Sequence, residues 1–430
     1  MKKFTMSVLI GLGVALTSCN LLSKDEAKNQ TNPQQFLRVD GVNIVDESGN
    51  KFFIEGTNLG NWLNPEGYMF GFNKIPRTPA TPTDPNSQHW INEMFCQMVG
   101  PAHTAEFWHQ FKENYITRAD IDYLASTGIN TLRLPFHYKL FTPDEYMGSN
   151  DENEGFARID SLLAWCRPQG LRVILDMHDA PGGQTGDNID DSYGYPWLLV
   201  TESCQQQFVD IWKRIAAYYC NEPLILGYEL INEPIAHYFE EDLEMLNGQL
   251  EPLYMRATAA IREVDTNHIV LWGGAQWNGN FKVFSNIGFD SNILFTCHRY
   301  GQEASVNGIK DFIAFRDSVG IAMYMGETGH NTNEWLKNMT KVMREQNIGF
   351  TLWPYKKMYE SSFVGFDAPE NWELVQQFAA ANRGTYAAIR AVRPDQQTAL
   401  EAMKQLLENC KFEHCNKQLG YIEAAGFKAE

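Results

Sequence analysis

The feature that most constrains the fold is an alternation of short apolar runs with amphipathic stretches over about 350 residues. Eight runs have the length and composition of strands, residues 52–56, 130–134, 171–177, 225–231, 268–272, 293–296, 322–325 and 349–352. Helical periodicity marks intervening residues 119–126, 159–167, 205–219, 253–264 and 334–346. This order predicts a parallel sheet, and eight units predict its closure into a single (β/α)8 TIM barrel.

Two turn signals precede the first of these strands. Val39-Asp40-Gly41 and Ser48-Gly49-Asn50 lie within residues 36–53 and predict a short N-terminal hairpin. We therefore expect a catalytic-domain barrel over residues 36–410, followed by a C-terminal extension over residues 411–430.

Composition and charge limit the partners of this domain. The chain of 430 residues is 44% hydrophobic, which suits one barrel or two medium domains. Its formal net charge of -18 disfavours nucleic acid and anionic membrane surfaces, because phosphate binding needs clustered Lys and Arg. A neutral or cationic ligand is favoured instead.

The first residues read as a targeting signal. Lys2 and Lys3 precede an apolar run over residues 4–16, which is shorter than the roughly 20 residues that span a bilayer. Leu16-Thr17-Ser18-Cys19 resembles a bacterial lipobox, which implies a signal peptide over residues 1–18 and lipidation of Cys19. The alternative is an ordinary cleaved signal peptide. Polar residues 19–35 then read as a flexible tether, so we expect an exported lipoprotein of the cell envelope, anchored in a membrane by its lipid.

The other seven cysteines form no Cys-x-x-Cys pair. Buried thiols are expected for most of them, and a Cys410–Cys415 disulfide stays open.

Polar residues fall repeatedly at the carboxyl ends of the predicted strands, where barrel enzymes assemble their sites. They are Arg133, His178, Asn232, Glu233, His298, Tyr300, Glu327 and Trp353. Two glutamates among them, Glu233 and Glu327, supply the pair of carboxyls that splitting a glycosidic bond requires. The alternative for these two is a role in structural salt bridges.

The order of the motifs resembles glycoside hydrolase family 5, the retaining barrel β-glycosidases. The matching pieces are Leu132-Arg133-Leu134-Pro135, Asp176-Met177-His178, Asn232-Glu233-Pro234, Cys297-His298-Arg299-Tyr300, Gly326-Glu327 and Leu352-Trp353. The resemblance implies that Glu233 is the general acid/base and Glu327 the nucleophile, and that neither a metal nor an organic cofactor is required.

The same resemblance implies the roles of the neighbours. Arg133 and Tyr300 would keep Glu327 ionised, and the negative charge of Glu327 would help Glu233 to hold a proton. Asn232 would bind a sugar 2-hydroxyl, while His178 and His298 would bind sugar hydroxyls and position the carboxyls. Trp353 would offer an apolar face to the pyranose ring.

Residues 57–62 and 178–195 are similar to loops of the exo-β-1,3-glucanase branch of the family, which implies a β-linked glucan or gluco-oligosaccharide as substrate. Another β-glycanase of the family, acting on mannan, xyloglucan, cellulose or a glycolipid, is the alternative, and a non-catalytic sugar-binding lipoprotein is a third. Extra aromatics near loop ends line sugar subsites or pack in the core: Trp62, Tyr193, Trp197, Trp272 and Trp277. The insertion at residues 73–87 is expected to form a lip of the cleft or to wrap the barrel.

Overall fold

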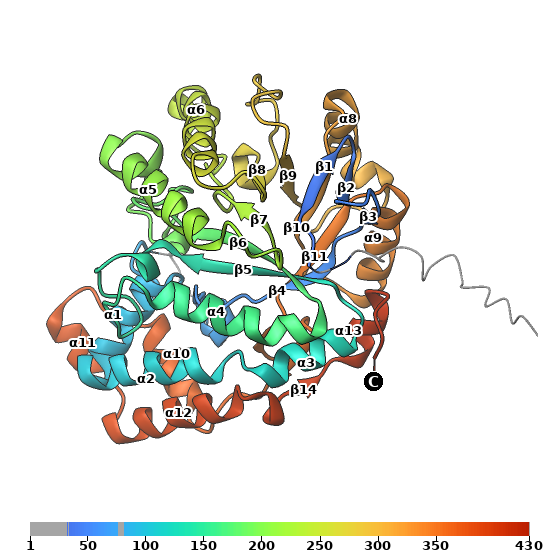
Figure 1. Cartoon of the computed structure of the whole chain (residues 1–430). Helices are drawn as coiled ribbons and strands as arrows, with labels where there is room; N and C mark the ends of the chain where they lie inside the picture. Colours follow the sequence, from blue (N-terminus) through green and yellow to red (C-terminus); the bar gives the residue numbers. More distant parts are fainter. Residues whose placement is uncertain (1–31, 33, 76–80, 430) are drawn as a thin grey trace, which may run out of the picture.

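Eight parallel strands close into a barrel in the computed structural model, which describes residues 32, 34–75 and 81–429. Around the barrel the order is β10-β11-β4-β5-β6-β7-β8-β9. The strands are β4 (Glu55–Asn58), β5 (Thr131–His137), β6 (Arg172–Asp179), β7 (Ile225–Glu229), β8 (Ile269–Gly273), β9 (Ile293–His298), β10 (Met323–Gly329) and β11 (Gly349–Trp353). The predicted (β/α)8 barrel is confirmed (Figure 1).

The first predicted strand, residues 52–56, is wrong in its position. Phe52 belongs to β3 (Lys51–Phe52), where it pairs antiparallel with Ile44, and the barrel strand β4 begins only at Glu55. One apolar run thus serves two sheets, because the chain leaves the hairpin and enters the barrel within a few residues.

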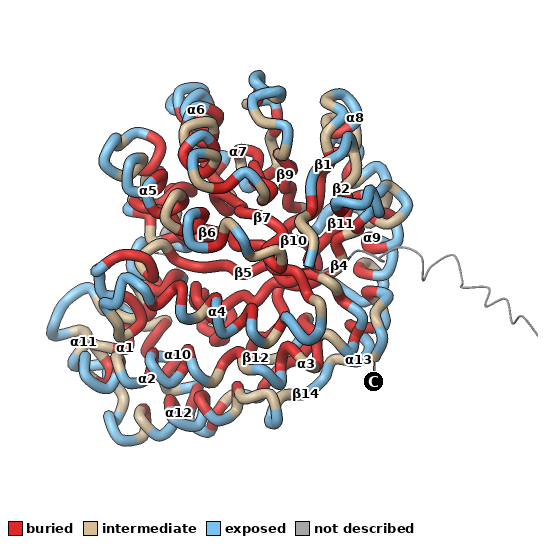
Figure 2. The backbone as a smooth tube through the Cα atoms, viewed as in Figure 1, coloured by how far each residue is buried: buried red, intermediate tan, exposed pale blue. Residues whose placement is uncertain are grey.

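The N-terminal hairpin closes the amino end of the barrel. Its two strands, β1 (Leu37–Asp40) and β2 (Asn43–Asp46), are joined by β3 in a three-stranded antiparallel sheet. Leu37, Ile44 and Phe52 from these strands pack with the inward residues of the barrel strands, including Ile174 and Leu226, in one buried cluster. This apolar floor leaves the carboxyl ends of the strands as the open face, and Figure 2 shows the strands buried beneath helices with exposed outer surfaces.

Helices surround the barrel between the strands. They are α3 (Arg118–Ser126), α4 (Glu154–Cys166), α5 (Glu202–Tyr219), α6 (Leu243–Arg262), the short α7 (Ala275–Asn278), α8 (Lys310–Val319) and α9 (Asn333–Glu345). Five further helices form a layer on one side of the barrel, at the lower left of Figure 1. They are α1 (Gln88–Val99), α2 (Pro101–Asn114), α10 (Trp372–Ala380), α11 (Tyr386–Val392) and α12 (Gln396–Asn409).

The described part of the C-terminal segment, residues 411–429, packs on the barrel domain. β14 (Asn416–Lys417) pairs with β13 (Val364–Phe366), which pairs in turn with β12 (Lys356–Met358). The following α13 (Leu419–Ala424) contacts α9. These contacts join the segment at 411–430 to the loop that follows β11.

Cys19 and the predicted signal and tether up to residue 31 lie outside the described residues. Within the described ranges, every helix is too short or too polar to cross a bilayer. All seven cysteines from Cys96 onward are free thiols, so the disulfide left open between Cys410 and Cys415 is not formed.

Candidate active site

A buried arginine lies at the centre of the open face. Arg133 on β5 has a side chain with 0% exposure and donates from Nε and Nη2 to both oxygens of Glu229, at 3.0 and 2.8 Å. Its Nη1 donates to Asn58 at 2.9 Å and to Glu327 at 2.7 Å, and its Nη2 lies 3.0 Å from Asp176. Burial disfavours the charge of Arg133, but these three carboxylates outweigh burial and raise its pKa.

The backbone of β10 aims Glu327 into the cleft through a bulge. The register with β9 shifts between Met325 and Glu327, so that Gly326 is an extra residue. A Cβ on Gly326 would lie 2.5 Å from Thr296 Oγ1, which explains why only glycine fits there. The Glu327 carboxyl accepts from Arg133 and, at 2.8 Å, from the hydroxyl of Tyr300. Both predicted partners of Glu327, Arg133 and Tyr300, therefore donate hydrogen bonds to its carboxyl.

Glu233 follows β7 in a different environment. Its φ of 43° lies in the left-handed region, a conformation that non-glycine residues adopt at a cost and that clusters at functional sites. Its Oε1 lies 2.8 Å from Nδ1 of His298. Burial raises the pKa of Glu233 to about 7, opposed by His178 and Arg133. The neighbouring charge that adds to the rise is Glu229, rather than the Glu327 that the sequence suggested.

The two glutamates face each other at short range. One carboxyl oxygen of Glu233 and one of Glu327 lie within 4.8 Å, and a nitrogen of His298 lies within the same distance of both. Retaining glycosidases hold their two carboxyls about 5 to 5.5 Å apart, whereas inverting enzymes need about 6.5 Å or more to admit a water molecule. The observed separation belongs to the retaining geometry.

The remaining predicted residues also meet in this cleft. Asn232 accepts from Arg133 at 2.9 Å and lies 3.3 Å from Nε2 of His178. His178 contacts Asp176 through Nδ1 at 2.7 Å and stacks on Trp353, with ring centroids 5.3 Å apart and planes 4° from parallel. Burial lowers the pKa values of His178 and His298 to about 4, so both imidazoles are neutral at pH 7. The structure thus brings together all eight residues predicted at the strand ends.

A cavity of about 940 Å³ opens above these residues. Besides the predicted residues, its lining includes Glu66, Tyr68, Asn73 and Trp277. Asn73 begins the 73–87 insertion, so this end of the insertion borders the cleft. Burial and the charges of Glu327 and Glu233 raise the pKa of Glu66, whose Oε1 has no hydrogen-bond partner among the described residues. Such an oxygen is available to a ligand hydroxyl.

The family model described as "Cellulase (glycosyl hydrolase family 5)" matches residues 91–358, more than half of the chain. The chain belongs to glycosyl hydrolase family 5. The predicted enzyme class, a glycosidase that hydrolyses O-glycosyl compounds, is thereby confirmed.

Three relatives of this family 5 chain carry different enzyme names. A β-xylosidase of Phanerodontia chrysosporium is 29% identical over 58% of this chain, which spans only 48% of that relative's length. Endoglucanase C of Acetivibrio thermocellus is 27% identical over 62% of this chain and 92% of its own length. The sporulation-specific glucan 1,3-β-glucosidase of Saccharomyces cerevisiae is 25% identical over 85% of this chain and 90% of its own.

Sequence reasoning missed the partner that holds Arg133. Glu229 is the last residue of β7, and it also accepts from the hydroxyl of Tyr324 at 2.6 Å. The signal was present in the sequence, because an acid inside the apolar run Ile225-Leu226-Gly227-Tyr228-Glu229-Leu230-Ile231 must be paired once it is buried. Asp176 lies likewise inside a fully buried strand.

The extra aromatics divide between packing and the cleft of this family 5 barrel. Trp62 and Trp272 are buried core residues, at 1% and 0% exposure, so a role in sugar binding is wrong for both. Trp277 is 37% exposed and lines the cleft, whereas Tyr193 and Trp197 are exposed outside its lining. The sequence around a tryptophan did not show whether its side chain lies in the core or in the cleft.

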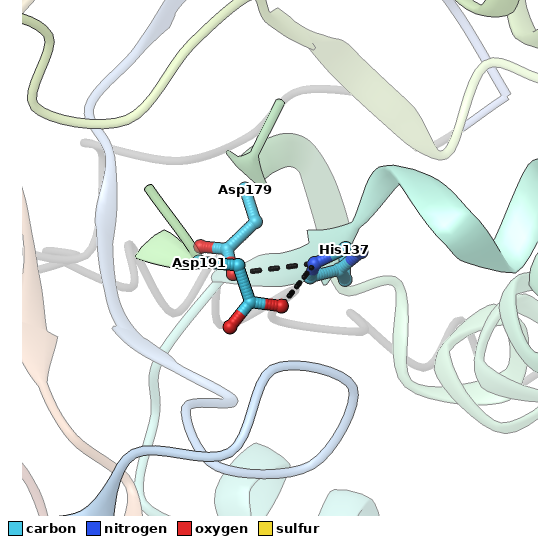
Figure 3. A group of neighbouring side chains, drawn as sticks. All are labelled: His137, Asp179 and Asp191. Carbon is cyan, nitrogen blue, oxygen red and sulfur yellow. Dashed lines mark hydrogen bonds and ion pairs between the residues drawn. The ribbon is translucent and has the colours of Figure 1, made fainter. Parts of the chain in front are cut away.

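A second polar cluster anchors the long loop after β6. His137 at the end of β5 contacts Asp191 of that loop at 3.0 Å and Asp179 at 3.5 Å, and Figure 3 shows both carboxylates directed at the same ring nitrogen. The backbone N–H of Lys139 donates to His137 Nδ1, so Nε2 carries the proton and donates to the carboxylates. A protonated Nε2 cannot bind a metal, and the cluster is therefore an anchor that fixes one wall of the cleft.

Proposed function

We propose that the protein is a retaining β-glycosidase in which Glu327 is the nucleophile and Glu233 the general acid/base. One observation carries this proposal: two carboxyls within 4.8 Å of each other have opposite environments. Glu327 accepts from a guanidinium and a phenol, while burial raises the pKa of Glu233 to about 7. One group is prepared to attack and the other to donate a proton.

The chemistry proceeds in two displacements. Glu327 attacks the anomeric carbon while Glu233 gives its proton to the departing glycosidic oxygen, which leaves a covalent glycosyl-enzyme on Glu327. Glu233, now ionised, takes a proton from a water molecule that attacks the same carbon and releases Glu327. Each step inverts the anomeric centre, so the product retains the β configuration.

In this proposal, side chains around the two glutamates bind the sugar and orient Glu233. Asn232, held by Arg133, binds the 2-hydroxyl, an interaction that strengthens in the transition state. His298 orients Glu233 through the 2.8 Å contact, and Trp353 and His178 bind the sugar beneath the reacting bond. Glu66 accepts a further sugar hydroxyl through its unpartnered oxygen.

We propose a β-linked glucan or gluco-oligosaccharide as the substrate. The names of an endoglucanase and a glucan 1,3-β-glucosidase among the relatives support it, as do the loops at 57–62 and 178–195. The β-xylosidase relative supports a β-xyloside as the second candidate.

We also propose that the protein is an exported lipoprotein held in the cell envelope by lipid on Cys19. The support is the lipobox-like Leu16-Thr17-Ser18-Cys19 after an apolar run. Mass spectrometry of the mature N-terminal peptide from its bacterial host is expected to find a diacylglyceryl group on Cys19. A chain that begins elsewhere, or an unmodified Cys19, would contradict the anchor.

The first test of the enzyme uses a panel of β-1,3-, β-1,4- and mixed-linkage glucans, mannan and xylan. Hydrolysis of at least one glucan is expected, and Glu327→Ala should lower kcat by about 10³-fold or more because no nucleophile remains. Azide should then restore turnover and yield the α-glycosyl azide, since small anions enter the space of the missing carboxylate. Glu334→Ala on the exposed face of α9 is the matched control. Substantial activity in Glu327→Ala would refute the nucleophile assignment.

If Glu233 is the general acid, its deprotonation sets the decline of kcat/KM on the alkaline side of the pH profile. The active form of Glu233 is protonated, so kcat/KM should fall as the pH rises through about 7, far above the 4.5 of an ordinary glutamate. Glu233→Ala should remove this decline and slow substrates with poor leaving groups by about 10²- to 10⁴-fold, with a smaller loss on activated aryl glycosides. An unchanged decline in Glu233→Ala would assign the titration to another group.

A further inference from the structure

A second cavity continues from the catalytic cleft. Its volume is about 600 Å³, and it shares Tyr68, Asn73 and His330 with the larger cavity. Tyr68 and His330 stack with ring centroids 5.6 Å apart, and Tyr68 accepts a hydrogen bond from the indole of Trp353. The two cavities therefore share part of their lining, and the shared Tyr68 contacts Trp353 of the catalytic site.

Two lysines line this second cavity. Lys357 on β12 is only 7% exposed, and its Nζ donates to Nε2 of His330 at 2.9 Å. Lys74 Nζ lies over the ring of Tyr359, 4.3 Å from its centroid. Among the described residues, no carboxylate lies within 4.0 Å of either ammonium group. The lining also contains two acids, Glu360 and Asp367, and both are exposed.

An enclosed, unpaired ammonium group is unusual, because buried charges in proteins are normally paired. Burial and the charge of Lys74 together lower the pKa of Lys357 to about 8, so it is charged at neutral pH. His330 cannot neutralise it, since burial and Lys357 lower the pKa of His330 to about 4. An anionic ligand in the cavity would give Lys357 the ion pair that it lacks among the described residues.

We propose that this cavity is a subsite for an anionic substituent, a carboxylate or a sulfate, on a sugar unit next to the reacting one. The proposal rests on the proposed glycosidase function. It also departs from the preference for neutral or cationic ligands that the net charge of -18 suggests, because the ammonium groups of Lys74 and Lys357 line the cavity without an ion pair to a described carboxylate.

The position of the cavity assigns the anionic unit to one side of the scissile bond. Glu233 follows β7 and gives its proton to the leaving group, whereas His330 directly follows β10, which carries Glu327. Lys357 lies in the chain that follows β11, the neighbour of β10 in the barrel. The anionic unit therefore belongs to the glycone, the part of the substrate that stays on Glu327.

The test compares three β-gluco-oligosaccharides of equal length: a neutral one, one with a glucuronic acid at the non-reducing end, and one with a 6-sulfate on that unit. The wild type should prefer at least one anionic oligosaccharide, and the preferred one identifies the substituent. Lys357→Met should lower kcat/KM for it by about tenfold or more, the worth of a charge-assisted hydrogen bond, and change the neutral substrate by less than about twofold. Lys357→Arg should restore much of the preference, and Lys337→Met, an exposed lysine of α9, is the control.

Hydrolysis of the neutral oligosaccharide with no anionic preference would overturn the subsite and leave the glycosidase function standing. A preference that survives in the Lys74→Met/Lys357→Met double variant would overturn it as well. If none of the three is hydrolysed, titration calorimetry with the same compounds decides the subsite separately from the function. Tighter binding of an anionic compound that is lost in Lys357→Met supports the subsite, and equal binding of all three overturns it.

Discussion

The structure depends on the buried charge of Arg133. A guanidinium with no exposure must be paired, because an uncompensated buried charge costs about 3 to 5 kcal/mol. Its partners Asn58, Asp176, Glu229 and Glu327 come from β4, β6, β7 and β10, so one side chain fixes the carboxyl ends of five strands relative to one another. The same contacts that satisfy Arg133 set the position of the candidate nucleophile.

The two candidate catalytic carboxyls differ because only that of Glu327 accepts a hydrogen bond from Arg133. Glu327 accepts from Arg133, whereas Glu233 contacts a neutral imidazole, that of His298, and burial lets Glu233 hold a proton. Two backbone irregularities make the difference possible: the bulge at Gly326 and the left-handed φ at Glu233. The regular barrel around Glu233 holds the strained backbone at that residue. In the neighbouring cavity, the ammonium group of Lys357 contacts His330 and, among the described residues, has no carboxylate within 4.0 Å.

The sequence predicted the fold well because most barrel strands contain a short apolar run, and these runs end where the chain reaches the open face. It misplaced the first strand, since the pattern cannot show that Phe52 pairs back with Ile44. The eight strand-end residues were predicted together, but the pairing of Arg133 with Glu229 depends on which strands become neighbours in three dimensions. Loop residues such as Glu66 carry no periodic signal, and their place in the cleft is fixed by tertiary packing alone.

The stereochemistry of the first product tests the central claim most directly. The claim is that two carboxyls within 4.8 Å act as nucleophile and acid/base, which requires two displacements at the anomeric carbon. Proton NMR of an early hydrolysis reaction resolves the two anomers of the newly formed reducing sugar before mutarotation mixes them. The account predicts that the β-anomer appears first and the α-anomer follows slowly. An α-anomer that appears first would show a single displacement by water and contradict the account.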